Sequence, residues 1–505
     1  MAEYYLGIDI GTYESKGVLI DGDCRVVAVH AERHGLENPR NNYFEHDAQE
    51  VWWGDFCKIT RSLLEESGKK NSDIAAVGAS TLGADLVAVD RDCMPLRKAI
   101  LYGIDARAEA EIAALNAKYG KEKVLEFNGR PLCSNDVPPK ILWLKNHEPR
   151  VWEKAYKLLT GSSFLTAKLT GEYVIDRFLA YGAFTPLYHT KDGTVDMEYC
   201  PEFCRPDQLA RVCDTTDVVG GITKKAARET GLLEGTPVIA GADDSGAEAI
   251  STGILEQGDM MIQIGSSLYL IGLCDRIVKD PRIWSGGFII PGACSVQGGT
   301  NNAGTLTRWY RDHLFSDLVK EEREGGENAY AAMLKGLEKI PPGSEGLITV
   351  PYFAGERTPV NDPEARGVLF GMTLRHTREH MYRSALEAVG YSLAEHFSIF
   401  EENNIPIRNV YAVGGGTKAP LWMQIISDIL GREIVTADVT VGAAFGDAVM
   451  AAIGVGRFRS FSEIRPYIKP KKIYHPDWKA HENYKPYFKM FLDLYSRNKD
   501  LMKKL

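Results

Sequence analysis

Several features that mark other classes of protein are missing from this sequence. No apolar run reaches the roughly 18 residues that a membrane-spanning helix needs. Basic residues are outnumbered, with 59 Lys and Arg against 68 Asp and Glu, and the formal charge of −9 disfavours nucleic acid or an anionic membrane as partner. The opening segment, MAEYYLGIDIG, lacks the basic start and apolar stretch of a secretory signal.

Cysteine is present without a pattern that binds metal. The nine cysteines include no CxxC pair, and no second Cys/His pair accompanies the nearest neighbours, Cys200 and Cys204. An odd set of cysteines without such spacing is typical of reduced thiols in a cytoplasm. The sequence therefore predicts a cytoplasmic protein with free thiols and without a structural metal.

The length of the chain predicts more than one domain. A chain of 505 residues exceeds what one hydrophobic core usually supports. Its 44% hydrophobic and 25% charged residues are ordinary for a globular protein, and strand and helix patterns mix in both halves. We therefore predict an α/β protein with domains at 1–250 and 251–505, which meet at a hinge near residue 250.

One local arrangement occurs twice. Strands expected over 4–9 and 16–20 flank a Gly-Thr turn, and strands expected over 259–264 and 268–273 flank a Gly-Ser-Ser turn. The two turns stand about half the chain length apart, which is typical of a remote duplication. We expect one phosphate-binding turn in each half.

The first turn carries the groups that a phosphate site needs. Gly11 lets the backbone approach a ligand, and Thr12 with the N–H groups of the turn can cradle phosphate oxygens. Lys16 adds a positive charge, and Asp9 can hold Mg²⁺ through water. A plain hairpin with a capping aspartate is the alternative, which the matching turn at 265–267 makes less attractive.

Two adjacent carboxylates follow a short apolar strand expected over 237–240. Asp243 and Asp244 come after two small residues, an arrangement typical of a cleft. Successive side chains diverge, so one carboxylate could accept the proton of an attacking hydroxyl while the other binds neighbouring hydroxyls. A pair that only caps the next helix is the alternative.

A glycine triplet follows another expected strand, over 410–413. Gly414, Gly415 and Gly416 exclude side chains from a place where a flat ring could lie against the backbone. A flexible turn is the alternative, because glycine triplets alone are weak evidence.

Two further segments match signature motifs of one protein family, in the order in which that family has them. Gly367-Val-Leu-Phe-Gly-Met372, followed after seven residues by His380-Met-Tyr-Arg-Ser-Ala-Leu-Glu387, fits one signature throughout. Lys140-Ile-Leu-Trp-Leu144 matches the core of another, although Val137 departs from its preferred small residue.

Two more segments complete the pattern. Pro351-Tyr-Phe-Ala-Gly-Glu-Arg-Thr-Pro359 with Asn361-Asp-Pro363 is similar to a stretch of the xylulokinases, and 414–424 is similar to an adenosine motif. On these segments the sequence resembles the FGGY family of carbohydrate kinases over essentially its whole length, with the xylulokinases nearest in pattern.

The resemblance implies a fold, an activity and a set of site residues. The fold is two ribonuclease-H-like domains of the actin-like ATPase type around a nucleotide cleft, the cofactors are ATP and Mg²⁺, and the partner is a small sugar. Asp243 falls on the catalytic base, Asp244 on a substrate-hydroxyl position, and Asp9 together with Asp243 on the metal-associated carboxylates. The nucleotide-binding positions are matched by Gly11, Thr12, Lys16, Gly265, Ser266, Ser267, Gly304, Gly415 and Gly416.

One departure concerns the sugar. Where xylulokinases commonly read Gln-Met-His-Gly, this chain reads Ser-Thr81-Leu82-Gly, and leucine cannot hydrogen-bond a hydroxyl. Thr81 and Leu82 therefore mark a substrate-contact position of altered chemistry. Asp105, in a segment similar to the family's Trp-x-Asp-x-Arg, either binds substrate or holds the wall of the site.

Several alternatives stay open at this point. A pentulose such as xylulose is the first expectation, ahead of ribulose, a hexulose, an aldonate or a polyol. An actin-like ATPase without a small-molecule acceptor and a catalytically silent sugar sensor are the rival classes, and a homodimer is one option for the assembly. The segment Glu356-Arg-Thr-Pro359 and the pair Asp243-Asp244 together favour a sugar kinase over these rival classes.

Overall fold

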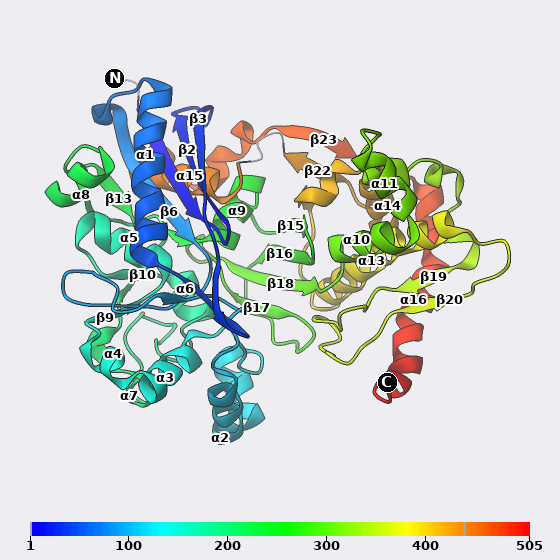
Figure 1. Cartoon of the computed structure of the whole chain (residues 1–505), viewed down its shortest axis with the longest axis horizontal. Helices are drawn as coiled ribbons and strands as arrows, with labels where there is room; N and C mark the ends of the chain where they lie inside the picture. Colours follow the sequence, from blue (N-terminus) through cyan, green and yellow to red (C-terminus); the bar gives the residue numbers. More distant parts are fainter. Residues whose placement is uncertain (1–2, 438–440) are drawn as a thin grey trace.

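The computed structural model describes residues 3–437 and 441–505, which form two lobes that lie side by side (Figure 1). The first lobe is built on a seven-stranded sheet of order β12-β13-β6-β1-β2-β3, with β14 paired to β6. These strands are β1 (Tyr4–Ile10), β2 (Glu14–Asp21), β3 (Val26–Arg33), β6 (Ile74–Thr81), β12 (Val218–Gly221), β13 (Pro237–Ile239) and β14 (Ala242–Asp243).

The second lobe is built on another seven-stranded sheet, of order β17-β18-β16-β15-β21-β22-β23. Its strands are β15 (Asp259–Ile264), β16 (Leu268–Cys274), β17 (Trp284–Gly287), β18 (Cys294–Thr300), β21 (Asn409–Val413), β22 (Ile434–Ala437) and β23 (Pro470–Tyr474). An antiparallel hairpin beside a parallel strand, β1/β2 with β6, recurs as β15/β16 with β21. The predicted repeat therefore extends beyond the turns to the centre of each sheet.

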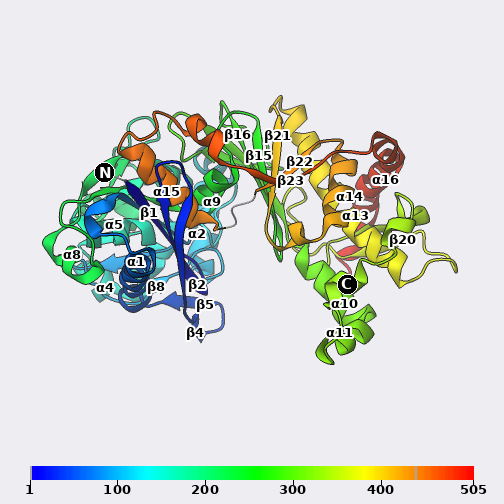
Figure 2. The same cartoon turned by 90° about the horizontal axis from the view of Figure 1, so that it is seen from above.

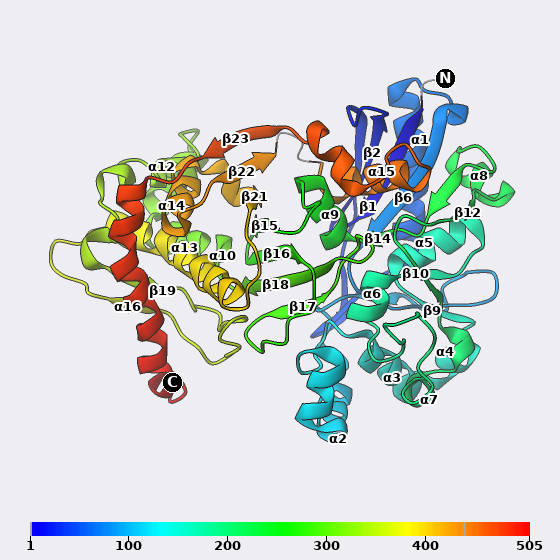
Figure 3. The ribbon, with the colours of Figure 1, turned by 180° about the vertical axis from the view of Figure 1, so that it is seen from behind.

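Two helices pack between the sheets. They are α9 (Asp244–Thr252) and α15 (Ala443–Gly454), and Figure 3 shows α9 between β14 and β15. One buried apolar cluster joins Tyr5 and Ile20 of the first sheet, Ile271 of the second, and residues of both helices. The two lobes therefore share a hydrophobic core.

The segment 443–454 lies on the first lobe although it comes late in the chain, as Figure 2 shows for α15 beside β1. Glycines permit this packing. A Cβ at Gly7 would overlap the carbonyl oxygen of Ala444, and one at Gly78 would lie 2.5 Å from that of Asp447. Because only hydrogen fits at these positions, the helix backbone rests directly on the sheet.

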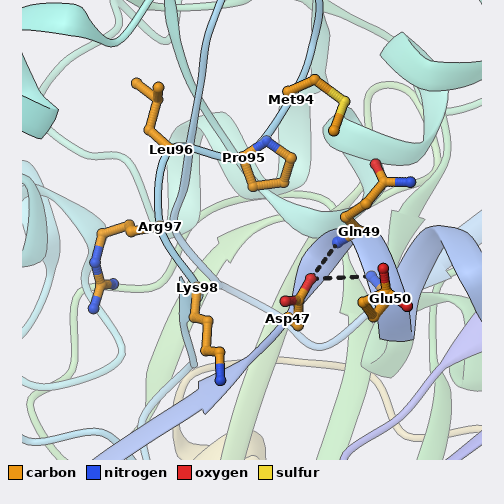
Figure 4. A pocket seen from close by; sticks show the side chains of 8 residues that line it. All are labelled: Asp47, Gln49, Glu50, Met94, Pro95, Leu96, Arg97 and Lys98. Atoms are coloured by element: carbon orange, nitrogen blue, oxygen red, sulfur yellow. Dashed lines mark hydrogen bonds between the residues drawn. The ribbon is translucent and has the colours of Figure 1, made fainter.

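Asp47 caps the start of a helix. Its carboxylate accepts hydrogen bonds of 3.0 Å from the N–H groups of Gln49 and Glu50 (Figure 4). The first turn, Ala48–Trp53, is π-helical and leads into α1 (Gly54–Ser67). A side-chain oxygen that satisfies free N–H groups is the usual way to start a helix.

Helices α3 (Val137–His147) and α5 (Gly161–Thr170) also belong to the first lobe, and Gly171 ends α5 with a φ of 82°. The terminal helix α16 (Trp478–Met502) starts after Asp477, whose carboxylate accepts from the N–H of Lys479 at 2.8 Å. Within the described ranges, no helix combines the length and apolarity needed to span a bilayer.

Candidate active site

Two carboxylates meet at one edge of the first sheet. Strand β6 pairs in parallel with β1 and with β14, so that Asp9 lies opposite Ser80 and Asp243 opposite Thr81. The carboxyl ends of parallel strands share one edge of a sheet, which is where ligands usually bind in α/β folds. The structure therefore brings together two predicted site residues from distant parts of the chain.

Asp243 is buried, and both of its carboxylate oxygens accept hydrogen bonds from neighbouring residues of the chain. Its Oδ1 accepts from the N–H of Gly246 at 2.9 Å, and its Oδ2 accepts from the hydroxyl of Ser245 at 2.6 Å.

 Burial raises the pKa of this carboxyl, and the two hydrogen bonds oppose the rise. A Cβ at Gly83 would lie 2.6 Å from the Cβ of Asp243, so glycine is needed beside it. Asp243 thus caps α9, as the alternative interpretation expected, and also faces the sheet edge.

Asp244 is the first residue of α9 and half-buried. Burial raises its pKa well above the ordinary value, and the carboxylates of Asp243, Asp9 and Glu248 raise it further. Burial likewise raises the pKa of Asp9 to about 7. Such crowding of carboxylates is relieved by a cation, and carboxylate oxygens suit Mg²⁺.

The carboxylates do not form a complete metal cage. Among the described residues, no three His, Cys, Asp or Glu side chains converge closely enough to hold a metal ion alone. Mg²⁺ that keeps its water shell and takes most of its ligands from nucleotide phosphates fits this arrangement.

Asp447, on α15, was not expected from the sequence. The hydroxyl oxygen of Ser80 lies 2.6 Å from Asp447 Oδ2 and 3.2 Å from Asp9 Oδ1. Burial raises the pKa of Asp447 well above its ordinary value. The Ser80 hydroxyl has a single proton and cannot donate to both carboxylates, so a protonated Asp447 can donate to Ser80 while Ser80 donates its own proton to Asp9. Only the packing of α15 on the first sheet reveals this link.

The first glycine turn is tight. The N–H of Gly11 donates to the carbonyl of Glu14 at 3.1 Å, and a Cβ at Gly11 would lie 2.8 Å from that oxygen. The hydroxyl of Thr12 lies 3.2 Å from that of Tyr102. Lys16 pairs with Asp9 in the hairpin register, while its ammonium group lies 3.1 Å from Glu14 Oε1.

The second glycine turn is held by the start of helix α10 (Gly304–Leu314). The N–H of Gly265 donates to the carbonyl of Ser267 at 3.0 Å, and the N–H of Gly304 donates to the carbonyl of Gly265 at 2.9 Å. The carbonyl of Ser266 accepts from the N–H of Thr305 at 2.9 Å. A Cβ at Gly304 would lie 2.5 Å from the Gly265 oxygen, which explains the glycine there.

The glycine triplet packs against the end of β15, next to the second turn. Gly414 has a φ of 91°, which favours glycine, and its Cβ would lie 2.6 Å from the Ile264 carbonyl oxygen. A Cβ at Gly416 would overlap the side chain of Ile264, whereas Gly415 faces open space. The predicted adenosine residues therefore adjoin the second phosphate turn.

The expected sugar-site residues of the first lobe are buried. Leu82 is 3% exposed within the hydrophobic core, and the Thr81 hydroxyl, packed against Gly161, has no hydrogen-bond partner in the described structure. Asp105 accepts from the N–H of Phe44 at 2.6 Å and from Arg107 through both oxygens. Because both oxygens are already bonded within the protein, the contacts of Asp105 favour a structural role in the wall of the site over a contact with substrate.

Asp85 is a second residue that the sequence interpretation missed. It is fully buried, and neither carboxylate oxygen has a hydrogen-bond partner among the described residues. Burial raises its pKa, and the nearby ammonium of Lys140 opposes the rise; burial lowers the pKa of Lys140 to about 8. Its position three residues after Leu82 was the only available signal.

A surface hollow lies apart from these residues. Its volume is about 360 Å³, and Figure 4 shows its lining side chains. They are Asp47, Gln49, Glu50, Met94, Pro95, Leu96, Arg97 and Lys98. None of the predicted site residues lines it, so we do not assign it to the reaction.

Comparison with known proteins agrees with this geometry. The N-terminal domain of the FGGY family of carbohydrate kinases matches residues 4–251, and the C-terminal domain of that family matches 266–455. A xylulose kinase of Bacillus subtilis (strain 168) is 28% identical over 503 residues, covering 99% of this chain and 98% of its own. A gluconokinase of the same organism is 27% identical, covering 98% and 96%.

A solved structure of xylulose kinase from Rhodospirillum rubrum is similar throughout. It has a TM-score of 0.90 at 28% identity and covers 99% of this chain and 100% of its own. The predicted fold of two actin-like ATPase domains is thereby confirmed, and so is the predicted class of enzyme. The chain belongs to the FGGY family of carbohydrate kinases, which phosphorylate sugars with ATP.

Proposed function

We propose that this kinase transfers the γ-phosphoryl group of MgATP to a primary hydroxyl of a small neutral ketose, with a pentulose such as xylulose as first candidate. The observation that carries the proposal is the placement of Asp243 beside Asp9 at one edge of the first sheet. The first phosphate turn begins two residues after Asp9, so base, metal carboxylate and phosphates would share one place.

In the proposed reaction, Asp243 accepts the proton of the sugar hydroxyl as that oxygen attacks the γ-phosphorus. Its raised pKa makes it a stronger base than an exposed carboxylate, and its bonds to Ser245 and Gly246 fix its orientation. Bound Mg²⁺, held through its water shell by Asp9, would neutralise phosphate charge.

The nucleotide would be bound mainly by main-chain groups. The N–H groups of Thr12 and Tyr13 in the first turn and of Ser266 and Ser267 in the second, with the Thr12 hydroxyl and Lys16, would bind the phosphates. Gly415 and Gly416 would lie against the adenosine. We further propose that the lobes close about the segment near residue 250, so that closure excludes water and limits ATP hydrolysis.

On the sugar side, Asp244 and Asp85 are the proposed hydroxyl acceptors. The oxygens of Asp85 lack hydrogen-bond partners among the described residues, and Asp244, at the start of α9, has a pKa raised by burial and by nearby carboxylates. Asp85 could supply the polar contact that Leu82 cannot. Asp105 would hold the wall through Arg107.

A gluconate-type substrate is the second candidate, because gluconokinases are nearly as similar as xylulose kinases. An aldonate carries a carboxylate, and this charge beside Asp85 and Asp244 would raise the already high pKa values of both carboxyl groups further, with the ammonium of Lys140 as the opposing charge. This balance of charge supports a neutral sugar over an acid.

The test is a coupled ADP-release screen over pentuloses, hexuloses, aldonates and polyols, with the phosphate position of the product assigned by NMR. We expect a neutral ketose to have the highest kcat/KM and to be phosphorylated on a primary hydroxyl. A higher kcat/KM for gluconate would overturn the substrate class, and an ATPase rate that no sugar stimulates would overturn the assigned acceptor.

One variant separates the sugar site from the nucleotide site. Asp85→Asn should raise KM for the sugar about tenfold while leaving KM for MgATP within about twofold, since it replaces one acceptor oxygen with an N–H donor and removes the charge that strengthens the bond to a hydroxyl. Equal effects on both KM values would mean that Asp85 supports the structure of the first lobe and does not bind the sugar.

A further inference from the structure

Two histidines lie behind the first glycine turn and are not used by the proposed reaction. The Nε2 atom of His34 lies 3.0 Å from the carbonyl oxygen of Gly11, and that of His46 lies 3.2 Å from the carbonyl oxygen of Thr12. The two rings contact each other edge to face, with centroids 5.0 Å apart. Each carbonyl of the turn is therefore bonded by its own imidazole.

The direction of the bond from His46 follows from its neighbours. The indole N–H of Trp52 donates to His46 Nδ1 at 3.1 Å, and an indole nitrogen is only a donor. The ring proton must therefore be on Nε2, from which it donates to the Thr12 carbonyl. Burial lowers the pKa of His46 to about 4, so the ring is neutral near pH 7.

His34 is held from its other side by a carboxylate. Its Nδ1 atom lies 2.8 Å from Asp55 Oδ2, and the hydroxyl of Ser15 donates to the same oxygen at 2.8 Å. The side chains of His34 and Asp55 are 6% and 5% exposed. Both ring nitrogens of His34 thus face acceptors, and the ring connects the turn to α1.

These contacts determine where the N–H groups of the turn point. In a trans peptide, the N–H of one residue is antiparallel to the C=O of the residue before it. The carbonyls of Gly11 and Thr12 point at the histidines, so the N–H groups of Thr12 and Tyr13 point the opposite way. In the part of the chain that the structure describes, neither N–H has a main-chain acceptor. Two adjacent free N–H groups are a binding site for an anion.

We propose that His34 and His46 are positioning residues for the phosphates of MgATP, which they serve by fixing the peptide planes of the Gly11-Thr12 turn. The inference rests on the proposed function, because it takes this turn as a phosphate site. The second turn has no imidazole partner among the described residues, since its carbonyls accept from N–H groups and from the Thr305 hydroxyl at the start of α10.

A pair of substitutions at one position tests the proposal. His34→Gln places an amide N–H where Nε2 was and keeps the bond to Gly11, whereas His34→Asn places it where Nδ1 was and keeps only the bond to Asp55. Calorimetry without sugar would measure the affinity of each variant for the Mg²⁺ complex of a non-hydrolysable ATP analogue. We expect about tenfold weaker binding for His34→Asn and a change within about twofold for His34→Gln.

The control is His30→Gln, on the preceding strand β3, where the histidine bonds Glu66 and Glu32 away from the turn. It should bind the analogue as wild type does. Equal affinities for His34→Asn and His34→Gln, or weaker binding by His34→Gln, would overturn the proposal. If His34→Asn does not fold, as judged by its melting temperature, the same pair at His46 decides in the same way. Because the assay contains no sugar, a protein that binds the analogue but phosphorylates no sugar overturns only the proposed substrate.

Discussion

The two lobes carry the same hairpin and hold it by different means. Strand β1 has Asp9 two residues before Gly11, whereas β15 has Gln263 two residues before Gly265. The carbonyls of the first turn accept from imidazoles, and those of the second accept from main-chain N–H groups of α10. The first turn thus depends on two imidazoles, and the second depends on main-chain N–H groups and one hydroxyl at the start of α10.

The polar side chains beside the two turns also differ. The carboxylates Asp9, Asp243 and Asp244 gather beside the first turn, while Gln263 donates its amide to Glu248 at 2.6 Å. The carboxylates that we propose as base and metal partner, Asp243 and Asp9, therefore lie beside the turn of the first lobe. The second lobe offers glycine and backbone, which suits the binding of phosphate and adenosine.

The largest effect is expected when the proposed base, Asp243, is replaced. Asp243→Asn is isosteric and removes proton acceptance, so we expect kcat to fall by about 10²–10⁴-fold or more while the affinity for MgATP is kept. Initial rates and calorimetry check both quantities. A variant that keeps more than about a tenth of the wild-type kcat would remove Asp243 from this role.

Alanine substitutions at equivalent positions of the two hairpins should have unequal effects on kcat. Asp9→Ala should lower kcat roughly tenfold to a hundredfold and raise the Mg²⁺ concentration needed for half activity, because the metal loses a partner of its water shell. Gln263→Ala should change kcat by no more than about threefold. Titration of Mg²⁺ at fixed ATP measures the contrast, and an unchanged metal dependence in Asp9→Ala would make Asp9 structural.

The second turn should be sensitive to backbone crowding instead. Gly304→Ala places a methyl group 2.5 Å from the Gly265 carbonyl oxygen, so the turn must shift. We expect KM for MgATP to rise about tenfold with KM for the sugar little changed. Gly286→Ala, where a Cβ meets open space, is the matched control in the same lobe. Equal kinetics of the two variants would mean that the turn tolerates the shift.

The smallest effect concerns pH, where one buried histidine of each lobe can be compared. Burial lowers the pKa of His46 and of His396 to about 4, from the ordinary value of 6.5. The unfolded chain then binds more protons between these values, so each histidine removes stability as pH falls from 6.5 towards 4, by up to about 1.4 kcal/mol per pH unit.

Buried carboxylates with raised pKa values act in the opposite sense, so the measurement is a difference between wild type and variant. Denaturant unfolding at pH 4.5 and 6.5 should show a flatter pH dependence for both His46→Gln and His396→Gln. Of the asparagine variants, His46→Asn should weaken nucleotide binding and His396→Asn should not, because His396 bonds Thr358 and Ser392 in the second lobe.

Much of the fold could be predicted because its signals are local. The two hairpins, the strand before Asp243 and the helix capped by Asp47 are each encoded within about ten residues by periodicity and turn chemistry. The acidic pair and the glycine turns were recognisable for the same reason. Their catalytic roles remain proposals.

Other features could not be read from local pattern. Asp105 had two open interpretations until its contacts with Arg107 and Phe44 were known, and Asp85 carried no motif of its own. Whether a buried carboxylate is fully bonded depends on neighbours that are remote in sequence.

The sequence by itself determined the family, the repeated hairpin and the order of the site residues along the chain. Only the tertiary structure decided that α15 packs on the first lobe, that Asp447 reaches Asp9 through Ser80, and that His34 and His46 bond the first turn. The physical reason is that hairpins and caps follow from neighbouring residues, whereas these contacts join distant segments whose meeting depends on the packing of the whole core.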